Sequence, residues 1–436
     1  MTSAEPKKIS LLKSTLRVMA FLVLKKYNPK IVSITGSVGK TSTKEAVYTV
    51  LASRFRVRRS EKNYNNEIGL PLTVIGTESG KDSFWVWLTV FFKWLIVIIL
   101  PIEYPEILIL EMGADRPGDI KYLTSFVKSN VGIVTDVSLT HIEFFKNLEG
   151  VAKEKMSLVT GLDEKSLAVI NIDNEYIEKL KDQVKCRLAT FGFTDEAEMR
   201  ASDILFNYSE GQEIKGLSFK LNYKGTNLPV RLSNVLARHQ VYPALIAATV
   251  GVEFGINLVE STALLANFLP PHSRLSLLPG IKNTQIIDDT YNASPSSVGA
   301  ALEVLGEIKS QRKVAALGDM LELGEETEKS HRNVAKKFLE IKGDIFFAVG
   351  ARMKFAVSEL EQHGFKKENI FFFDNPMDAG KKIQEIMKEG DLVLVKGSQG
   401  IRMEKAVEEI MAEPQRASEL LCRQNKEWQE KTFKPV

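Results

Sequence analysis

The sequence predicts an α/β protein built on mostly parallel sheets, and three observations carry this prediction. Short apolar segments alternate with helical segments along most of the chain. A glycine-rich turn at 36–42 joins one apolar segment, 31–35, to a helix. The segment 106–111 is a continuous apolar run that ends in a carboxylate, as a central parallel strand does when it delivers an acid at its carboxyl edge. Strands that alternate with helices form a parallel sheet covered on both faces.

Length and composition indicate an ordinary globular protein of two or three domains. The chain has 436 residues, of which 44% are hydrophobic and 26% are charged. Its formal net charge of +3 does not indicate general nucleic-acid binding. Cys186 and Cys422 lie far apart, so they predict no disulfide framework or metal cluster and favour a reducing cytoplasm. The basic, apolar residues 1–26 show no small-residue cleavage site, so we do not interpret them as a signal peptide.

We expect the turn at 36–42 to bind a nucleoside triphosphate. Backbone N–H groups of such a turn close on a polyphosphate, a lysine neutralises its charge, and a hydroxyl reaches Mg²⁺. The general P-loop pattern places its first glycine where Ile34 stands, so the match is incomplete, and a chance glycine turn is the alternative. A strand, a turn, Gly-Lys-Thr and a helix in the right order favour the P-loop. The predicted phosphate-binding residues are Gly36, Ser37, Val38, Gly39, Lys40, Thr41 and Ser42.

The pattern of residues 11–252 predicts one α/β unit. The predicted strands are 31–35, 106–111, 131–137 and 167–173. The predicted helices are 11–24, 41–53, 119–128, 148–158, 175–181 and 241–252. Residues 217–232 alternate with period two, which predicts a small antiparallel patch. Residues 63–71, NYNNEIGLP, predict a loop, and their amides favour ligand contact over a solvated turn.

The pattern breaks near Leu269-Pro270-Pro271-His272, where we place a domain boundary. A second alternation follows, with strands at 285–288, 314–317, 345–349, 369–373 and 392–395, and helices that begin at 295, 327, 353, 377 and 402. We therefore expect a helical lead-in at 1–30, a central nucleotide-binding domain at 31–270 with a hydrophobic insertion near 84–101, a C-terminal α/β domain at 271–412, and a polar tail at 413–436.

Two residues beyond the turn are candidates for a metal or catalytic site. Glu111, at the end of its strand, is a candidate Mg²⁺ ligand. His141 lies just beyond the strand 131–137, and in a chain with five histidines we favour a site residue over a structural one. The helix 148–158 carries Lys153 and Lys155, and the ordinary interpretation of either is a solvated helix face.

Eight motifs, in order along residues 31–410, resemble those of the Mur ligase family. They are TGSVGKTSTKE, NYNNEIGLPLT, LEMGADRPGDI, THIEFFKNLEGVAKEKMSLV, ARHQVYPALIAA, DDTYNASPSS, LGDMLELGEE with His331, and LVKGSQGIRMEK. The resemblance implies a P-loop central domain, a Rossmann-like C-terminal domain, and an ATP-dependent amide ligase of peptidoglycan precursor synthesis. In that chemistry ATP phosphorylates a carboxylate and an amine attacks the acyl phosphate. The implied substrates are a muramoyl-peptide-like acceptor and an amine such as D-alanyl-D-alanine, with no nucleic acid.

The resemblance also implies roles for residues of the central domain. The implied ligands are Lys40 for the β- and γ-phosphates, Thr41 and Glu111 for one Mg²⁺, and His141, in part, for a second. Lys155 matches the family's carbamylated lysine. An ammonium repels Mg²⁺, whereas its CO₂ adduct is a carboxylate that binds the ion. The resemblance therefore replaces the solvated-face interpretation for Lys155, while Lys153 keeps it.

Further roles are implied for the C-terminal domain and for the loop 63–71. Arg274 matches the arginine that reaches the γ-phosphate from the domain boundary, so we expect domain closure around the substrates. The residues near nucleotide and substrate would be Asp289, Tyr291 and Asn292. The residues that receive the incoming dipeptide would be Asp319, His331, Lys396, Gly397 and Ser398. The expected substrate contacts of the loop are Asn65 and Asn66.

The sequence departs from the family pattern at several positions. Ser273 replaces the glycine usual before the arginine, and Asp136 replaces an asparagine. Gln240 and Pro243 replace asparagines of the adenine-side helix, and Gln399 replaces the arginine usual after Lys-Gly-Ser. About thirty residues precede the P-loop strand, where the family has a domain that binds the UDP end of its substrate. We therefore expect the acceptor's nucleotide end to be held by a separate UDP-binding partner, left free, or replaced by a lipid carrier.

Two alternatives to this function remain, and the second comes from a different class. The first is a relative that joins amino acids to another carboxylate, as folate- and cyanophycin-type ligases do. The stretches NNEIGLP and LGDMLELGEE favour the dipeptide-adding branch over it. The second is a P-loop switch or scaffold that binds nucleotide without making amide bonds. No Asn-Lys-x-Asp guanine motif is present, and a scaffold has no need of Glu111, His141 and Lys155 together.

Residues 84–100, FWVWLTVFFKWLIVIIL, approach the lower length limit of a membrane span. A single crossing would separate Lys40 from Glu111 and Lys155, which must meet at one nucleotide, so we exclude a span. A buried core helix and a surface helix that touches the inner leaflet remain. Three tryptophans in this stretch suit an interface, and helix 11–24 is expected beside it. We therefore predict peripheral attachment to the cytoplasmic face of the cell membrane.

Overall fold

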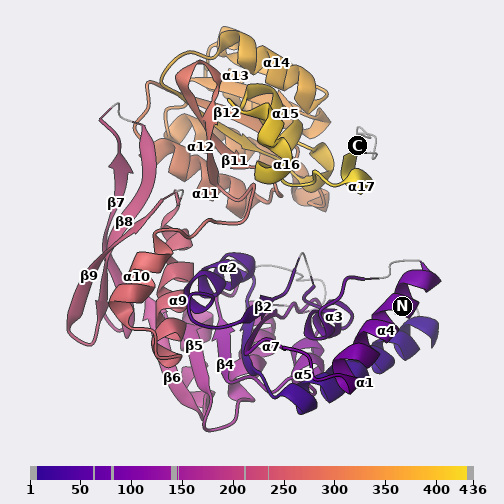
Figure 1. Cartoon of the computed structure of the whole chain (residues 1–436). Coiled ribbons are helices and arrows are strands. Elements are labelled where there is room, and N and C mark those ends of the chain that lie inside the picture. Colours follow the sequence, from indigo (N-terminus) through magenta and orange to yellow (C-terminus); the bar gives the residue numbers. More distant parts are fainter. Residues whose placement is uncertain are drawn as a thin grey trace. The chain divides into compact units, whose positions relative to one another are not determined.

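The chain folds into two compact units. The computed structural model describes residues 7–61, 64–79, 83–138, 145, 147–210, 213–233 and 235–429. The first unit comprises Met1–Ile204, Phe219–Arg231 and Arg238–Phe268, and the second comprises Leu205–Ser218, Leu232–Ala237 and Leu269–Val436. Figure 1 shows the elements coloured along the sequence. The glycine-rich turn at 36–42 therefore belongs to the first unit and the DDTYN motif to the second.

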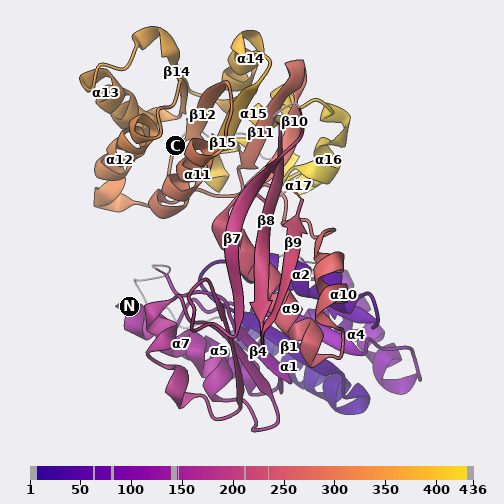
Figure 2. The ribbon, with the colours of Figure 1, turned by 90° about the vertical axis from the view of Figure 1, so that its left-hand side faces the viewer.

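The larger sheet has nine strands in the order β2-β3-β1-β4-β5-β6-β7-β8-β9. Their bounds are β1 Lys30–Thr35, β2 Val57–Arg59, β3 Ile107–Glu111, β4 Val131–Val134, β5 Leu167–Asn171, β6 Arg187–Gly192, β7 Met199–Tyr208, β8 Ile214–Tyr223 and β9 Thr226–Leu232. Every pair from β2 to β7 in this order is parallel. Only Lys224-Gly225 joins β8 to β9, so these two form a hairpin. Figure 2 shows β7, β8 and β9 side by side.

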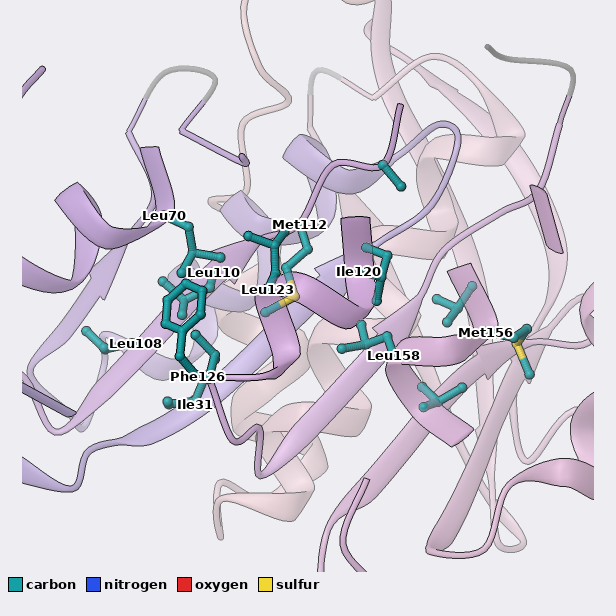
Figure 3. Close-up of a cluster of buried hydrophobic side chains, with 14 of the residues drawn as sticks. Ile31, Leu70, Leu108, Leu110, Met112, Ile120, Leu123, Phe126, Met156 and Leu158 are labelled. Atoms are coloured by element: carbon teal, nitrogen blue, oxygen red, sulfur yellow. The ribbon is translucent and has the colours of Figure 1, made fainter. Parts of the chain in front are cut away.

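Helices cover this sheet, and alternate strand residues face different layers. One hydrophobic core holds Leu108 and Leu110 of β3 and is partly shown in Figure 3. The helices that contribute to it are α1 (Lys7–Tyr27), α3 (Gly69–Ile75), α4 (Phe84–Ile99), α5 (Asp119–Thr124), α7 (Leu148–Thr160) and α8 (Glu175–Glu178). A second group, α2 (Lys40–Leu51), α9 (Val241–Glu253) and α10 (Leu258–Leu265), packs together. Glu111 is adjacent to Leu110 in β3, so its side chain points to the opposite face of the sheet. There it accepts a hydrogen bond from Thr41 of α2, a helix of this second group.

The second unit is built on a six-stranded sheet in the order β10-β11-β15-β12-β13-β14. Its strands are β10 Ser276–Gly280, β11 Thr284–Asp289, β12 Arg312–Gly318, β13 Ile345–Val349, β14 Ile370–Phe373 and β15 Asp391–Lys396. Only β10 pairs antiparallel, which confirms the mostly parallel α/β prediction. One core is formed with α11 (Pro295–Glu307), α12 (Thr327–Glu340) and α13 (Lys354–Gln362), and another with α14 (Pro376–Ile386), α15 (Glu404–Ile410) and α16 (Ala417–Leu420).

Several local predictions are corrected. The run 63–71 is not all loop, because α3 begins at Gly69: Asn66 Oδ1 accepts hydrogen bonds from Ile68 N and Gly69 N, at 3.2 and 2.9 Å. Pro71 lies in the first turn of α3, where its missing N–H costs no helical hydrogen bond. The predicted helix 119–128 ends at Thr124, and the predicted strand 131–137 ends at Val134. The sequence analysis also did not include β2, β6, β7, β10 and α10.

The apolar stretch 84–100 forms α4 (Phe84–Ile99), which packs against α1 and α3. Val90 and Val97 are buried, whereas Trp85 and Ile99 are 74% and 69% exposed. The stretch is therefore a surface helix with one buried side, and not a core helix. Across the described residues, no helix combines the length and the apolarity that a membrane crossing requires.

Candidate active site

The glycine-rich turn fits closely against the end of β4. A Cβ atom on Gly36, whose φ is 151°, would lie 1.9 Å from Thr135 Oγ1, so only glycine fits there. The Thr135 hydroxyl donates to Val38 O at 2.6 Å. The Lys40 ammonium folds over the turn and donates to Gly36 O at 2.6 Å. The turn therefore has the compact shape, with a lysine across it, that phosphate binding requires.

A hydroxyl and a carboxylate meet beside this turn. Thr41 Oγ1 donates to Glu111 Oε2 at 3.2 Å, and Asn65 Nδ2 donates to Glu111 Oε1 at 3.4 Å. The parallel register, which places Ile34 opposite Glu111, brings the acid to the start of α2. Hydroxyl and carboxylate oxygens are the hard ligands that Mg²⁺ prefers, so Thr41 and Glu111 fit this ion.

The described residues contain no group of three or more His, Cys, Asp or Glu side chains arranged to hold a metal ion. His141, the predicted ligand of a second Mg²⁺, lies outside the described residues. Ser42, in the first turn of α2, is half-buried. The other hydroxyl of the turn, on Ser37, donates to Ser138 O at 3.1 Å and so ties the turn to the segment that follows β4.

Lys155 is a buried lysine on α7, with 3% of its surface exposed. Its pKa falls from the ordinary 10.5 to about 7, mainly because the amine is buried and to a smaller extent because Lys40 is positively charged. The negative charges of Glu154, Asp115 and Asp136 partly oppose this fall. Much of the amine is then neutral near pH 7, and the neutral amine is the form that reacts with CO₂. Lys153, two residues away on the same helix, is exposed.

This low pKa makes folding stability depend on pH. Below about pH 7 the amine is charged in both the folded and the unfolded chain, so the full free-energy cost of burying a charge lowers the stability of the folded chain. Between about pH 7 and 10.5 the unfolded chain binds the proton that the folded chain has lost, so stability rises with pH. We expect wild type to gain stability relative to Lys155→Met across this window, measured by urea unfolding in CO₂-free buffer. A constant difference between the two proteins would contradict the low pKa.

A polar and aromatic cluster lies at the neighbouring strand ends of the first unit. Tyr242 donates its hydroxyl to Asp173 Oδ2 at 2.8 Å and stacks on Phe193 at a centroid distance of 4.4 Å. Asn174 Nδ2 donates to Asp136 Oδ1 at 2.8 Å. Burial raises the pKa of Asp136, and the Asn174 bond opposes this. Gln240 and Pro243, the substituted positions of the adenine-side helix, are buried next to Tyr242 along the chain. The motif ARHQVYPALIAA contained Tyr242, yet its role was not predicted.

In the second unit, three predicted residues lie at the carboxyl ends of parallel strands, where ligands bind in such sheets. Lys396, at the end of β15, is 2% exposed and donates to Asp289 Oδ2 at 2.6 Å and to Asn292 O at 2.8 Å. Asn292 Oδ1 accepts a hydrogen bond from Gln399 N at 3.4 Å. The strand ends β11 and β15 are thus joined by one buried ion pair.

Asp319, His331 and Ser398 hold the backbone around the end of β12. Met320 N donates to His331 Nε2 at 3.1 Å, so the other nitrogen, Nδ1, carries the proton and donates to Thr327 O at 2.6 Å. Burial lowers the pKa of His331, in keeping with a neutral ring. The Ser398 hydroxyl donates to Ala293 O at 3.2 Å. Asp319 Oδ1 accepts from Met353 N at 2.9 Å, and burial raises its pKa. The buried His331 ring therefore supports this loop.

Arg274 and Tyr291 form a second group in the same unit. The Arg274 guanidinium lies 4.2 Å from the centroid of the Tyr291 ring. Ser273, which replaces the family's glycine, has a φ of 58° in the left-handed region that glycine favours. Its hydroxyl donates to Asp288 Oδ2 at 2.7 Å, and burial raises the pKa of Asp288 to about 6. The serine thus adopts a left-handed conformation and adds a hydrogen bond to the DDTYN motif.

The sequence analysis missed a contribution from the polar tail. Arg423 donates to Thr290 O and, at 2.9 Å, to Tyr291 O. Its guanidinium also pairs with the buried Glu404 at 2.8 Å. Cys422 N donates to the Ser273 hydroxyl at 3.1 Å. The tail therefore fixes the backbone that carries Tyr291, and no pattern in the sequence links these distant segments.

We expect Arg423→Ala to lower stability by about 2 kcal/mol, because charged hydrogen bonds to two carbonyls and Glu404 are lost. Loosening of the Tyr291 backbone should raise the KM for ATP more than it lowers kcat. Arg423→Lys should restore little, since a lysine lacks the planar fork. The matched control is Arg416→Ala, an exposed ion pair of the same tail, which should leave the unfolding midpoint unchanged. An unchanged midpoint in Arg423→Ala would contradict this role.

A phosphate turn with a threonine and a glutamate beside it, in a chain of two α/β units, defines an enzyme class that uses a nucleoside triphosphate with Mg²⁺. Residues 34–87 and 99–251 match the Mur ligase middle domain, and residues 273–399 match the Mur ligase, glutamate ligase domain. These two domains together account for most of the chain, which therefore belongs to the Mur ligase family.

Individual relatives indicate which branch of this family the chain resembles. A UDP-N-acetylmuramoyl-tripeptide–D-alanyl-D-alanine ligase of Bacillus subtilis is 28% identical over 92% of this chain and 80% of its own length. The Escherichia coli enzyme of the same name is 29% identical over 87% of this chain and 76% of its own length. Among solved structures, MurF of Thermotoga maritima in complex with ADP has a TM-score of 0.72 at 26% identity, covering 91% of this chain and 83% of that one. MurF of Acinetobacter baumannii shares the fold, with a TM-score of 0.75 at 22% identity over 91% and 79%.

Proposed function

We propose that this Mur ligase joins D-alanyl-D-alanine, or a closely similar amine, to the carboxylate of a muramoyl-peptide-like acceptor in peptidoglycan precursor synthesis. The observation that carries the proposal is the meeting of Thr41 and Glu111 beside the Lys40 turn, in a chain whose relatives carry this activity in their names. ATP and Mg²⁺ are the cofactors of this reaction.

The chain's own residues have three tasks in this reaction. The turn 36–42 and Lys40 bind the phosphates, and Thr41 with Glu111 would hold Mg²⁺, which supplies charge neutralisation when bound. The acceptor's carboxylate oxygen attacks the γ-phosphorus and ADP leaves; the amine then attacks the acyl carbon, and phosphate leaves with that oxygen. Arg274 is the proposed contact of the γ-phosphate, and Asn65 and Asn66 the proposed contacts of the acceptor.

The amine-binding part of the proposal lies in the second unit. The polar groups at the strand ends, Asp319, Lys396 and Ser398, are buried and hydrogen-bonded, and we propose that they fix the loops whose surface receives the dipeptide. His331 contributes by fixing Met320 N, and Asn292 by its bond to Gln399 N. Asp289 and Tyr291 are proposed to lie at the nucleotide side of this surface.

Lys155 is proposed to work as a carbamate that completes the Mg²⁺ site together with His141. The support for this is the low pKa of a buried lysine near Lys40. A carbamate converts an unfavourable buried cation into an oxygen ligand for the metal. The localisation we propose is the cytoplasm, at the inner face of the cell membrane.

The ligase proposal is tested by incubating the pure protein with ATP, Mg²⁺, D-alanyl-D-alanine and a UDP-muramoyl-tripeptide. Phosphate release should require the acceptor and the dipeptide together, and mass spectrometry should detect the acceptor extended by two alanines. Replacing the dipeptide with L-glutamate, the amine of folate-type ligases, is the control and should give no product. Phosphate release that ignores both substrates would contradict the proposal.

A further inference from the structure

The outer side of α4 is an apolar row that faces solvent. Trp85, Phe92, Ile96 and Ile99 follow one another at intervals of about one or two turns, so they share one helix face. Their exposed fractions are 74, 54, 48 and 69%. A row of large apolar side chains that are this exposed to solvent is typical of an interaction surface.

Helix α1 lies beside α4. Figure 1 shows the two helices side by side, and the Trp94 indole N–H donates to Met19 O at 3.1 Å. Lys26 Nζ donates to Val97 O and Leu100 O, at 3.0 and 2.7 Å, and so caps the carboxyl end of α4. The exposed side of α1 is mixed, because Ser10, Ser14 and Thr15 are exposed among its apolar residues. Its exposed apolar residues are Ile9, Leu11, Val18, Phe21 and Leu22.

The charge of this helix pair has one sign. Residues 7–27 and 84–99 contain seven lysines and arginines and no aspartate or glutamate. Lys25 and Lys93 are exposed next to the exposed apolar side chains of the two helices. Lys13 of α1 is paired with Glu67 of the loop that precedes α3, at 3.3 Å. A basic surface with exposed tryptophan and phenylalanine complements an anionic bilayer, where cations bind headgroups and aromatic rings enter the interface.

Part of this helix pair lies outside the match to the family. The match to the Mur ligase middle domain begins at residue 34, after α1, and omits residues 88–98, which lie within α4. The matched domains contain the phosphate turn, Glu111 and Lys155 without this stretch. The match therefore leaves out α1 and residues 88–98 of α4, and the chemistry of the site does not account for the apolar exterior of these segments.

We propose that the outer face of α1 and α4 binds the surface of an anionic lipid bilayer, with its exposed apolar side chains in the interface and Lys25 and Lys93 at the headgroups. This rests on the proposed localisation of the ligase. The substrates that the site uses are unaffected by it, so vesicle binding and ligation are separate readouts.

The test is flotation of the full chain with vesicles of phosphatidylcholine alone or with phosphatidylglycerol. Wild type should float with the anionic vesicles and bind neutral ones about tenfold less. Trp85→Ser/Phe92→Ser/Ile99→Ser should reduce flotation about tenfold or more and keep ligase activity in vesicle-free buffer. The matched control, Val259→Ser/Leu269→Ser/Met377→Ser, removes exposed apolar residues elsewhere and should float as wild type does. Lys25→Gln/Lys93→Gln should lose the preference for anionic vesicles.

Three results would overturn the proposal. One is wild type that remains in the soluble fraction with both vesicles, and another is a triple variant that floats as wild type does. The third is a wild-type dimer by light scattering that becomes a monomer in the triple variant and never floats, because the face would then join two copies of the chain. The ligase assay run beside each arm separates these failures from failure of the proposed function.

Discussion

Lys155→Ala is expected to lower amide formation by at least about 10²-fold while ATP still binds. The proposed carbamate supplies an oxygen ligand to Mg²⁺, whereas the phosphates are bound chiefly by the turn 36–42 and Lys40. The loss should therefore appear in kcat, with a nucleotide Kd close to that of wild type. Steady-state kinetics and calorimetric titration with a non-hydrolysable ATP analogue measure the two quantities.

Lys153→Ala is the matched control, because this lysine lies on the same helix and is exposed. It should retain wild-type kinetics. Added formate or acetate should restore part of the activity of Lys155→Ala, since a small carboxylate takes the place of the carbamate. Wild-type ligation by Lys155→Ala would show that the metal assignment is wrong.

Lys396→Met is expected to destabilise the second unit by about 3–5 kcal/mol, because it leaves the Asp289 carboxylate buried without its cation. The lost bond to Asn292 O should also loosen the DDTYN motif. Urea unfolding, followed by intrinsic fluorescence, measures the change in the free energy of unfolding.

The double variant Asp289→Asn/Lys396→Met separates charge from packing. It removes both charges, and the asparagine oxygen still accepts from Leu275 N, as Asp289 Oδ1 does at 3.2 Å. Most of the stability should return, whereas ligase activity should not, because the proposed substrate-side groups are absent. A double variant no more stable than Lys396→Met would contradict the unpaired-charge explanation.

The sequence predicted those parts of the fold that local pattern determines. Continuous apolar runs such as 107–111 and 345–349 identified central strands, since both faces of a parallel sheet are buried. Strands with mixed burial, such as β6 and β7, lack that signal. The start of α3 was missed because Asn66 and Pro71, which favour loops, also favour the first turn of a helix.

The sequence could point to candidate site residues that lie within a short local motif, as Lys40 and Thr41 do in one motif and Glu111 in another. The role of the tail could not be predicted, because Arg423 acts on Thr290 and Tyr291 through contacts that only the folded chain brings together. The exterior of α4 was predictable in composition, but its exposed side depends on where α1 and α3 pack.

The central claim is that ATP activates the acceptor's carboxylate as an acyl phosphate, and an isotope transfer measures this directly. The acceptor is prepared with ¹⁸O in both oxygens of the reacting carboxylate, and the phosphate released with D-alanyl-D-alanine is analysed by mass spectrometry. The account predicts one ¹⁸O atom in each phosphate, since the carboxylate oxygen that attacks the γ-phosphorus leaves with it. Unlabelled phosphate, which arises when water attacks ATP, would contradict the account.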